Sequence, residues 1–359
     1  MATVRLDQKR RALVRDVPAS FTNALARYFG TGPTDVELAR QQQRAYIKAL
    51  EDNGVSVHRL PADENHPDCM FVEDQAVVVD GHMLLPTPGH PSRVAEQPPI
   101  AEFLMAALEG VQTCTMGGEA RMDGGDIIRL GDLFFVGRSS RTNDLGITSL
   151  RSLLDFFGHE LRVIDIPEHA LHLTSISSTP TDDLILAPEG YLTPEDFGDL
   201  PEGCEILWMP GEEVYGCNTI GLPNGKVLMA EGYPAVKAAL QARGLDLIEV
   251  DMSEIRAADG ALTCCSIFYC RRNRSSHGAH PRPQEPDEFS ARLTVPHVLL
   301  QNTRGRFIGH GQTVGFRVEL QGLRVVLVQP NFKDDPWLIS LGVGCKHRCG
   351  KERNEIFQR

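Results

Sequence analysis

The sequence predicts an α/β fold made of similar small units, because turn signals, helix patterns and polar residues recur along residues 1–270. Short apolar runs joined by Asp-Gly or Asn-Gly predict hairpins, since these residues adopt the positive φ values of tight turns. Helical patterns that stop at a glycine alternate with the hairpins. Polar residues open the hairpins at intervals near 50 residues, a period that indicates a stacked or radial repeat.

Hairpins are predicted wherever a two-residue turn signal separates apolar runs. They cover 76–85 around Asp80-Gly81, 127–136 around Gly131-Asp132, 176–186 around Asp182-Asp183, and 218–229 around Asn224-Gly225. Helices are predicted between them, each followed by a glycine, which favours the left-handed stop of a helix. They cover 34–51 with Thr34 as cap, 100–108, 147–157 and 235–242, followed by Gly54, Gly110, Gly158 and Gly244.

One polar residue opens each unit at a regular position. Glu73, Asp123, His172, Asn218 and Cys264 lie 50, 49, 46 and 46 residues apart. If each unit is a small sheet with a helix and the units surround an axis, the opening strands converge there. One polar side chain from each unit would then point into a common pocket. The alternative is that regular loop lengths produced this spacing by chance.

Composition excludes several classes of function. The net charge of −12 argues against nucleic acid as a partner, because phosphate backbones attract basic surfaces. No apolar run approaches the roughly 20 residues of a membrane span. The stretch from Met1 to Arg15 does not resemble a signal peptide, and nine cysteines then predict free thiols in a reducing compartment. We therefore expect a cytoplasmic protein.

Charge divides the chain near residue 270. Residues 1–270 carry 21 basic and 40 acidic residues, whereas 271–359 carry 15 basic and 8 acidic ones. We predict a catalytic domain over 1–270, a linker over 271–290 rich in charge and turn formers, and a basic C-terminal extension over 291–359 whose order the sequence leaves open. Within the extension, 322–328 could form a strand. Cys345 and Cys349 lack two further ligands at suitable spacing for zinc.

The residues at the converging positions predict chemistry on a cation. Cys264 is a candidate nucleophile, and His172, at an equivalent repeat position, is the candidate base that a thiol needs nearby. Asp68, Glu73, Asp74 and Asp123 would crowd the same pocket, where like charges repel unless a cation neutralises them. A guanidinium supplies that charge, and its N–H fork matches carboxylates. A solvated acidic face is the alternative, although strand-forming residues bracket the acids.

Five ordered motifs resemble the dimethylarginine dimethylaminohydrolase family. They are Asp68-Cys-Met-Phe-Val-Glu-Asp74, Met122-Asp-Gly-Gly-Asp-Ile-Ile128, Phe134-Phe-Val-Gly-Arg-Ser-Ser-Arg-Thr-Asn143, Leu171-His-Leu173 and Asp259-Gly-Ala-Leu-Thr-Cys-Cys-Ser266. The resemblance spans residues 12–269. It implies a five-unit pseudo-symmetric α/β propeller of ββαβ modules, as in the guanidino-group-modifying superfamily, with an additional C-terminal segment. It also implies hydrolysis of Nω-methylated arginines to citrulline and methylamine or dimethylamine.

The resemblance implies a role for each site residue. Cys264 would attack the guanidinium carbon, and His172 would protonate the leaving amine and then activate water, with imidazole suited to both transfers near neutral pH. Asp123 would orient His172 and hold the guanidinium. Asp74 would complete the cation site together with Asp68 and Glu73.

The amino-acid end of the substrate is expected to bind two arginines. Arg93 and Arg141 have the bidentate fork that suits a carboxylate. Leu25 aligns with a substrate-covering loop of the family, and Ala258 with a backbone contact to the substrate. Thr174 replaces the substrate-binding aspartate of arginine deiminases, and Glu73 stands where deiminases carry arginine. Both departures favour methylated arginine over free arginine.

Two other functions stay open from the sequence. One is arginine deiminase, and the other is a catalytically silent arginine-binding regulatory protein. No cofactor is expected and no metal is required, although zinc could bind Cys264 and His172 reversibly and block the nucleophile. The partner we expect is a small methylated arginine. The sequence leaves open a homodimer and the choice between mono- and dimethylarginine.

Overall fold

The computed structural model describes residues 3–108, 113–270 and 298–300, and then 306–310, 313–320, 323–330 and 338–342. The chain divides into two compact units, one of Met1–Gln284 with Pro296–Leu299 and one of Glu285–Val295 with Leu300–Arg359. The predicted linker over 271–290 and the pair Cys345 and Cys349 lie outside the described residues.

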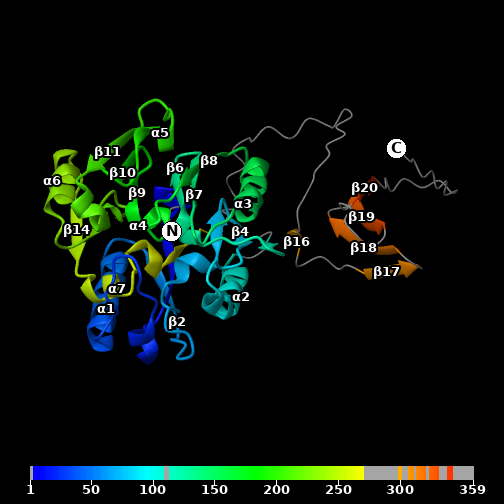
Figure 1. Cartoon of the computed structure of the whole chain (residues 1–359), viewed down its shortest axis with the longest axis horizontal. Coiled ribbons are helices and arrows are strands. Elements are labelled where there is room, and N and C mark those ends of the chain that lie inside the picture. Colours follow the sequence, from blue (N-terminus) through cyan, green and yellow to red (C-terminus); the bar gives the residue numbers. More distant parts are fainter. Residues whose placement is uncertain are drawn as a thin grey trace. The chain divides into compact units, whose positions relative to one another are not determined.

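The first unit contains five small mixed sheets with one connectivity (Figure 1). In each sheet the middle strand pairs antiparallel with one neighbour and parallel with the other. The sheets are β3 Val77–Val79, β4 His82–Leu85 and β5 Thr113–Met116; β6 Ile127–Leu130, β7 Leu133–Arg138 and β8 Glu160–Asp165; β9 Ser178–Thr181, β10 Leu184–Pro188 and β11 Glu205–Met209; β12 Ile220–Gly221, β13 Val227–Ala230 and β14 Leu247–Val250; and β15 Ile267–Phe268, β1 Arg11–Arg15 and β2 Ser56–Leu60. Strand β16 Val298–Leu300 lies beside β5.

All of the predicted hairpins form, as β3–β4, β6–β7, β9–β10 and β12–β13. Asp80 and Gly81 both adopt positive φ, 48° and 78°, as their pairing in a tight turn requires. The third strand of each sheet was not predicted. It pairs in parallel after a crossover, and a parallel crossover has no local turn signal.

Of the α-helices, α1, α2, α3 and α6 lie around the outside of the sheets and are well separated from one another (Figure 1), whereas all residues of α4 are buried. They are α1 Val36–Asp52, α2 Gln97–Ala107, α3 Asp144–Phe157, α4 Leu173–Ile176, α5 Pro194–Phe197, α6 Pro234–Ala242 and α7 Ser253–Ala257. The cap of α1 is Asp35 and not Thr34, because the Asp35 carboxylate accepts the N–H groups of Glu37 and Leu38. None of the helices in the described part of the chain has the length and apolar character that crossing a bilayer needs.

Apolar clusters fill the spaces between successive sheets. Val77 and Val79 pack into a cluster with residues of the β6–β8 sheet, whereas Val78 packs into a cluster with Leu13 and Ile267 of the β1–β2–β15 sheet. This alternation follows from the period of two along a strand and lets one sheet bury both faces. In the remaining sheet β1 pairs with β15, which lies about 250 residues later in the chain.

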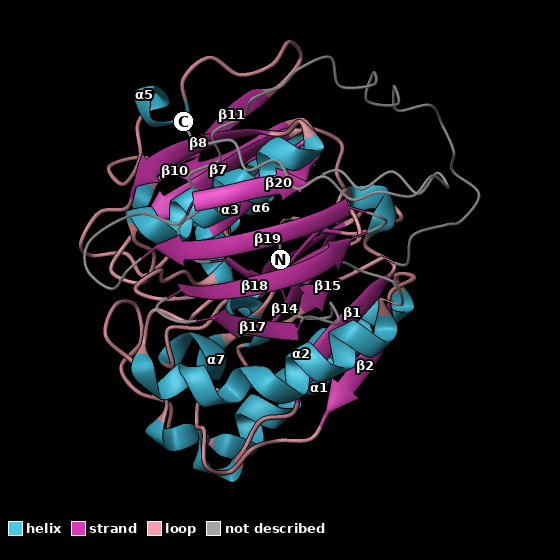
Figure 2. Cartoon of the chain, turned by 90° about the vertical axis from the view of Figure 1, so that its right-hand side faces the viewer, coloured by secondary structure: helices cyan, strands magenta, loops and turns pink. Residues whose placement is uncertain are grey.

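The second unit contains an antiparallel sheet, whose strands lie side by side in Figure 2. Its order is β17 Arg306–His310, β18 Thr313–Leu320, β19 Leu323–Pro330 and β20 Leu338–Gly342. The strand predicted over 322–328 corresponds to β19.

Candidate active site

The polar residues that open the units lie at the starts of the sheets, but only two of them line the main pocket. Those two are His172 and Cys264, on the rim of a cavity of about 430 Å³. Asp123 and Glu73 are buried beneath it. Asn218 is also buried, and its side chain bonds the carbonyl of Thr174 and both the N–H and the hydroxyl of Thr263. The expectation that all five would point into one pocket is therefore wrong for Glu73, Asp123 and Asn218, and the polar atoms of Asn218 are bonded to Thr174 and Thr263 instead.

Most of the predicted substrate-binding residues surround the same cavity. The pocket is lined by Leu25, Asp68, Asp74, Arg93, Arg141, Ala258, His172 and Cys264, among others. These residues come from segments as distant as the stretch before α1 and the turn before β15. The structure thus brings together eight of the ten predicted site residues. The other two, Asp123 and Glu73, are buried outside the pocket lining, where Asp123 contacts His172 and Glu73 accepts the hydroxyl of Thr263.

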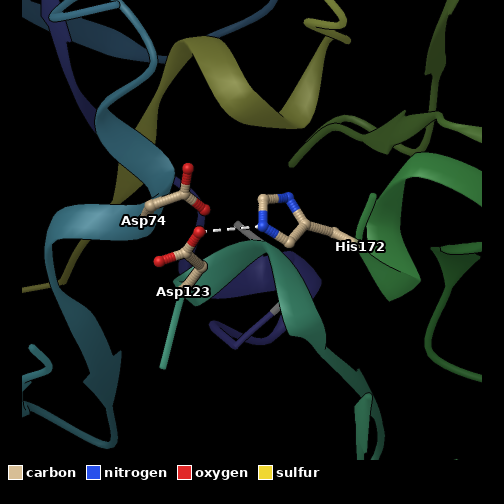
Figure 3. A group of neighbouring side chains, drawn as sticks. All are labelled: Asp74, Asp123 and His172. Carbon is tan, nitrogen blue, oxygen red and sulfur yellow. Dashed lines mark hydrogen bonds and ion pairs between the residues drawn. The ribbon is translucent and has the colours of Figure 1, made fainter. Parts of the chain in front are cut away.

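Asp123 holds His172 through the interaction drawn as a dashed line in Figure 3. The His172 Nε2 atom lies 3.0 Å from Asp123 Oδ2, and both side chains are almost completely buried. The backbone N–H of Gly89 donates to the other Asp123 oxygen at 2.7 Å. Arg141 Nη1 approaches Asp123 Oδ2 at 3.3 Å. The imidazole is therefore oriented by a carboxylate that is itself fixed by two further partners.

The carboxylates around His172 raise its pKa by more than burial lowers it. Burial lowers the pKa of His172, but the negative charges of Asp74, Asp126 and Asp123 together raise it to about 9. The His172 Nδ1 atom is buried and makes no hydrogen bond within the described residues. At neutral pH the ring is thus a charged acid, fixed at Nε2, with Nδ1 available to other groups.

Cys264 lies in the turn Thr263–Cys265, next to the acids. The Thr263 hydroxyl donates to Glu73 Oε2 at 2.9 Å. Burial raises the pKa of the Cys264 thiol well above its usual range, and the charges of Glu73 and Asp74 raise it further. The thiol is therefore neutral in the ligand-free pocket, and a bound cation would favour the thiolate.

Arg93 is engaged by protein groups rather than projecting freely into the pocket. Its guanidinium contacts Asp74 Oδ2 at 2.7 Å and Glu96 Oε2 at 2.7 Å, and it also donates to the carbonyls of Asp68 and Phe71. Because four of its five N–H groups have acceptors among the described residues, Arg93 is better arranged to fix Asp74 than to hold a substrate carboxylate. Arg141, with a side chain 12% exposed, is the more accessible of the two arginines.

One group of described side chains could bind a metal ion. Asp74, Asp123 and His172 each offer a ligand atom, and these atoms lie within 4.8 Å of one another. Cys264 is not part of the group. Arg93 already neutralises Asp74, and Arg141 already contacts Asp123, so a divalent cation would have to compete with both arginines. This donor set fits a metal poorly, and zinc at Cys264 and His172 stays a prediction.

Asp259 anchors the loop that carries Leu25. Its carboxylate accepts the backbone N–H groups of four consecutive residues, Arg27, Tyr28, Phe29 and Gly30, the last three at 2.9, 2.7 and 2.6 Å. Asp259 adopts φ 59°, a left-handed conformation that costs free energy in residues other than glycine unless the surroundings favour it. Here the four hydrogen bonds supply that compensation.

The same loop is fixed at two more points around the pocket. The N–H of Leu25 donates to Asp68 Oδ1 at 3.0 Å, and the Tyr28 hydroxyl lies 3.2 Å from that of Ser140. Ser140 precedes Arg141. The loop therefore connects the acidic side of the pocket with its Arg141 side.

Sequence reasoning missed three residues that shape the site. Asp126 and Asp259 stand inside the quoted motifs, but their partners are distant in sequence, so no local pattern revealed a role. Gly125 was also missed. A Cβ atom there would approach His172 Nδ1 to 2.8 Å and Asp74 Oδ1 to 3.0 Å, so only glycine lets the imidazole pack against this turn.

Comparisons with known proteins agree with this geometry. No family model matches the sequence. It is 34% identical over 239 residues to N(G),N(G)-dimethylarginine dimethylaminohydrolase of Pseudomonas aeruginosa, covering 66% of this chain and 91% of that protein.

Two solved structures are similar over 72% of this chain and 99% of theirs. A dimethylarginine dimethylaminohydrolase adduct with S-methyl-L-thiocitrulline, in a histidine-to-glycine variant, is 29% identical with a TM-score of 0.67. A cysteine-to-serine variant of the Pseudomonas aeruginosa enzyme complexed with citrulline is 30% identical with a TM-score of 0.65. From the extent of both kinds of similarity, this chain belongs to the dimethylarginine dimethylaminohydrolase family.

Proposed function

We propose that this chain hydrolyses Nω-methylated arginines to citrulline and methylamine or dimethylamine. The observation that carries the proposal is one pocket lined by a buried thiol, a charged imidazole and several carboxylates. The acidic walls fit a guanidinium, because its delocalised charge and N–H fork match carboxylates. The names of the relatives support the same substrate class.

The chemistry follows from the charges in the pocket. As the substrate cation binds, the Cys264 thiol loses its proton to solvent, and the thiolate sulfur forms a bond to the guanidinium carbon. The C–N bond to the methylated nitrogen breaks as His172 gives its proton to the departing amine. The resulting S-alkylthiouronium reacts with water, from which neutral His172 takes a proton. The C–S bond then breaks, the remaining hydroxyl proton passes to solvent, and citrulline and the Cys264 thiolate are released.

The negative charge of Asp74 should lower the reactivity of the Cys264 thiol in the ligand-free protein. Replacing Asp74 with asparagine removes a negative charge that raises the thiol pKa, so the pKa falls and alkylation at pH 7–8 becomes faster. The measurement is the pH dependence of iodoacetamide alkylation of Cys264, followed by peptide mass spectrometry in wild type and variant. Unchanged or slower alkylation in Asp74→Asn would contradict this electrostatic account.

The loop anchored by Asp259 should act on substrate binding. Asparagine tolerates the left-handed conformation but offers one acceptor oxygen instead of two, so Asp259→Asn loosens the loop without breaking the turn. We expect KM for dimethylarginine to rise about 10-fold, the equivalent of one hydrogen bond to a charged group, with a smaller change in kcat. Asp35→Asn is the matched control, because it alters an N–H-accepting carboxylate that does not line the pocket. An equal rise in both variants would assign the effect to general destabilisation.

Arginine deiminase is the second candidate, since unmethylated arginine carries the same cation. The contacts of Thr174 favour the first proposal. Its hydroxyl lies 3.4 Å from Glu73, below the pocket, and it adds no carboxylate for an unsubstituted guanidinium.

Citrulline release by the purified full-length chain is the deciding measurement. Asymmetric dimethylarginine, monomethylarginine and arginine are supplied in parallel at the same concentrations, with Cys264→Ser as the blank. We expect both methylated substrates to be preferred over arginine. Preference for arginine would make the protein a deiminase. Saturable binding of all three, with citrulline no higher than in the blank, would make it a silent binding protein.

The architectural and cellular predictions are part of the same proposal. We propose that the five sheets are the five ββαβ units of an α/β propeller, which is supported by an apolar cluster between each pair of successive sheets. We also propose that residues 1–270 are the catalytic domain, with 291–359 an extension not needed for hydrolysis. A cytoplasmic location and a homodimer remain predictions of the sequence.

A further inference from the structure

Asp126 is a buried carboxylate to which the mechanism assigns nothing. It lies three residues after Asp123 in the Asp-Gly-Gly-Asp motif and has no exposed surface. Burying a charge costs free energy unless hydrogen bonds compensate for it. The contacts of Asp126 therefore indicate what it is for.

One oxygen of Asp126 contacts the chain beside His172. Oδ1 accepts the backbone N–H of Leu173 at 3.1 Å, 47 residues away in the sequence. His172 is the residue immediately before α4, so this bond fixes the peptide from which the imidazole projects. A Cβ atom at Gly137 would approach this oxygen to 2.7 Å, so glycine there is needed for the carboxylate to fit.

The other oxygen of Asp126 holds the loop of Arg141. Oδ2 accepts the hydroxyls of Ser139 and Thr142, each at 2.6 Å. Ser139 in turn accepts the backbone N–H groups of Arg141 and Thr142 at 3.0 and 3.2 Å. Arg141 is thus enclosed by two residues that Asp126 fixes directly.

We propose that Asp126 is a positioning residue that sets His172 and Arg141 relative to each other, so that the acid–base group and the substrate-binding arginine share one anchor. The inference rests on the proposed hydrolase function of the pocket. A small displacement of a reacting group is enough to lower a rate about 10²-fold, and a single anchor limits such displacement at both groups together. Asp126 touches neither the substrate position nor Cys264, so its effect is indirect.

Electrostatics adds a signature that a purely structural contact lacks. His172 faces the carboxylates of Asp74, Asp123 and Asp126 and interacts electrostatically with Glu73, and Arg141 offsets part of the charge of Asp123. Burial raises the pKa of Asp126 to about 6, so above that pH it is an anion that raises the pKa of His172. Removing this charge lowers the pKa of His172, and the alkaline limit of activity then moves to lower pH. Below pH 6 the difference should shrink, because Asp126 is itself neutral there.

The test compares Asp126→Asn with Ser139→Ala in the full-length chain. Asparagine keeps the size and an acceptor for Leu173, so we expect a fold close to wild type. The loss of kcat/KM should be about 10- to 100-fold, the range expected for a misplaced reacting group. The alkaline limit of activity should move to lower pH. Ser139→Ala loses a contact only on the Arg141 side. It should raise KM several-fold and leave the alkaline limb unchanged.

Each outcome decides the proposal. A wild-type pH profile and wild-type kcat/KM in a folded Asp126→Asn variant would overturn it. If that variant does not fold, Ser139→Ala still decides, since an unchanged KM would remove the Arg141 half of the anchor. The pKa of His172 measured by NMR in ligand-free wild type and Asp126→Asn separates this inference from the proposed function. If the pKa of His172 is lower in Asp126→Asn but the wild-type protein releases no citrulline, the proposed hydrolase function is refuted, whereas the electrostatic contact between Asp126 and His172 is supported.

Discussion

Replacing Cys264 with serine should reduce kcat for dimethylarginine by roughly 10³-fold or more, because a hydroxyl ionises far less readily than a thiol and His172, protonated at neutral pH, does not act as its base. The bound guanidinium lowers a thiol pKa far enough to give thiolate, whereas a hydroxyl starts several units higher. Dimethylarginine should still bind, since the carboxylates of the pocket are unchanged. Citrulline release and calorimetric titration measure the two effects separately.

The control for this variant is Cys265→Ser, at the neighbouring buried cysteine. Cys265 donates to the carbonyl of Ala261 at 3.3 Å and does not line the pocket. The Cys265→Ser variant should retain most of the activity if the loss in Cys264→Ser is specific to the nucleophile. Equal loss in both variants, or activity in Cys264→Ser close to wild type, would show that Cys264 is not the reacting group.

Replacing His172 with alanine should separate the two proton transfers. With dimethylarginine the variant should lose about 10²- to 10⁴-fold in kcat, because the departing amine is no longer protonated. With S-methyl-L-thiocitrulline the first step should survive, since a thiolate leaves without a proton. The second step should still fail for want of a base. Mass spectrometry of the intact protein should then show the S-alkylthiouronium adduct.

That adduct should be absent when dimethylarginine replaces S-methyl-L-thiocitrulline. It should also be absent in the double variant with Cys264→Ser, which locates it on the sulfur. Turnover of both substrates at the wild-type rate would exclude His172 from either transfer. The buried pair of His172 and Asp123 gives the ring one orientation, so removal of the ring should not be compensated by another residue of the described pocket.

Local features of the fold were predictable because their causes are local. The turn at Asp80-Gly81 follows from two residues that tolerate positive φ, and Gly158 ends α3 at φ 75° for the same reason. The pairing of β1 with β15 was not predictable in this way. It joins segments about 250 residues apart, and the sequence of either short strand contains no pattern that identifies its partner.

The structure gathers most of the predicted site residues around one pocket, whereas their contacts could not be read from the sequence. Their spacing placed Asp123, His172 and Cys264 before β6, β9 and β15, strands of three of the five sheets, because a repeat returns equivalent positions to equivalent places. Arg93 shows the limit. The sequence favours it as a carboxylate-binding arm, but in the fold it bonds Asp74 and Glu96.

The sequence by itself determined the repeat, the hairpins, the family resemblance and the chemical types of the groups that meet. Only the tertiary structure decided the protonation of those groups: a pKa of about 9 for His172, a neutral thiol at Cys264 and a charged Asp126 above pH 6. The reason is physical. Protonation in a buried site depends on desolvation and on charges a few ångströms away, and here those charges come from other units of the chain.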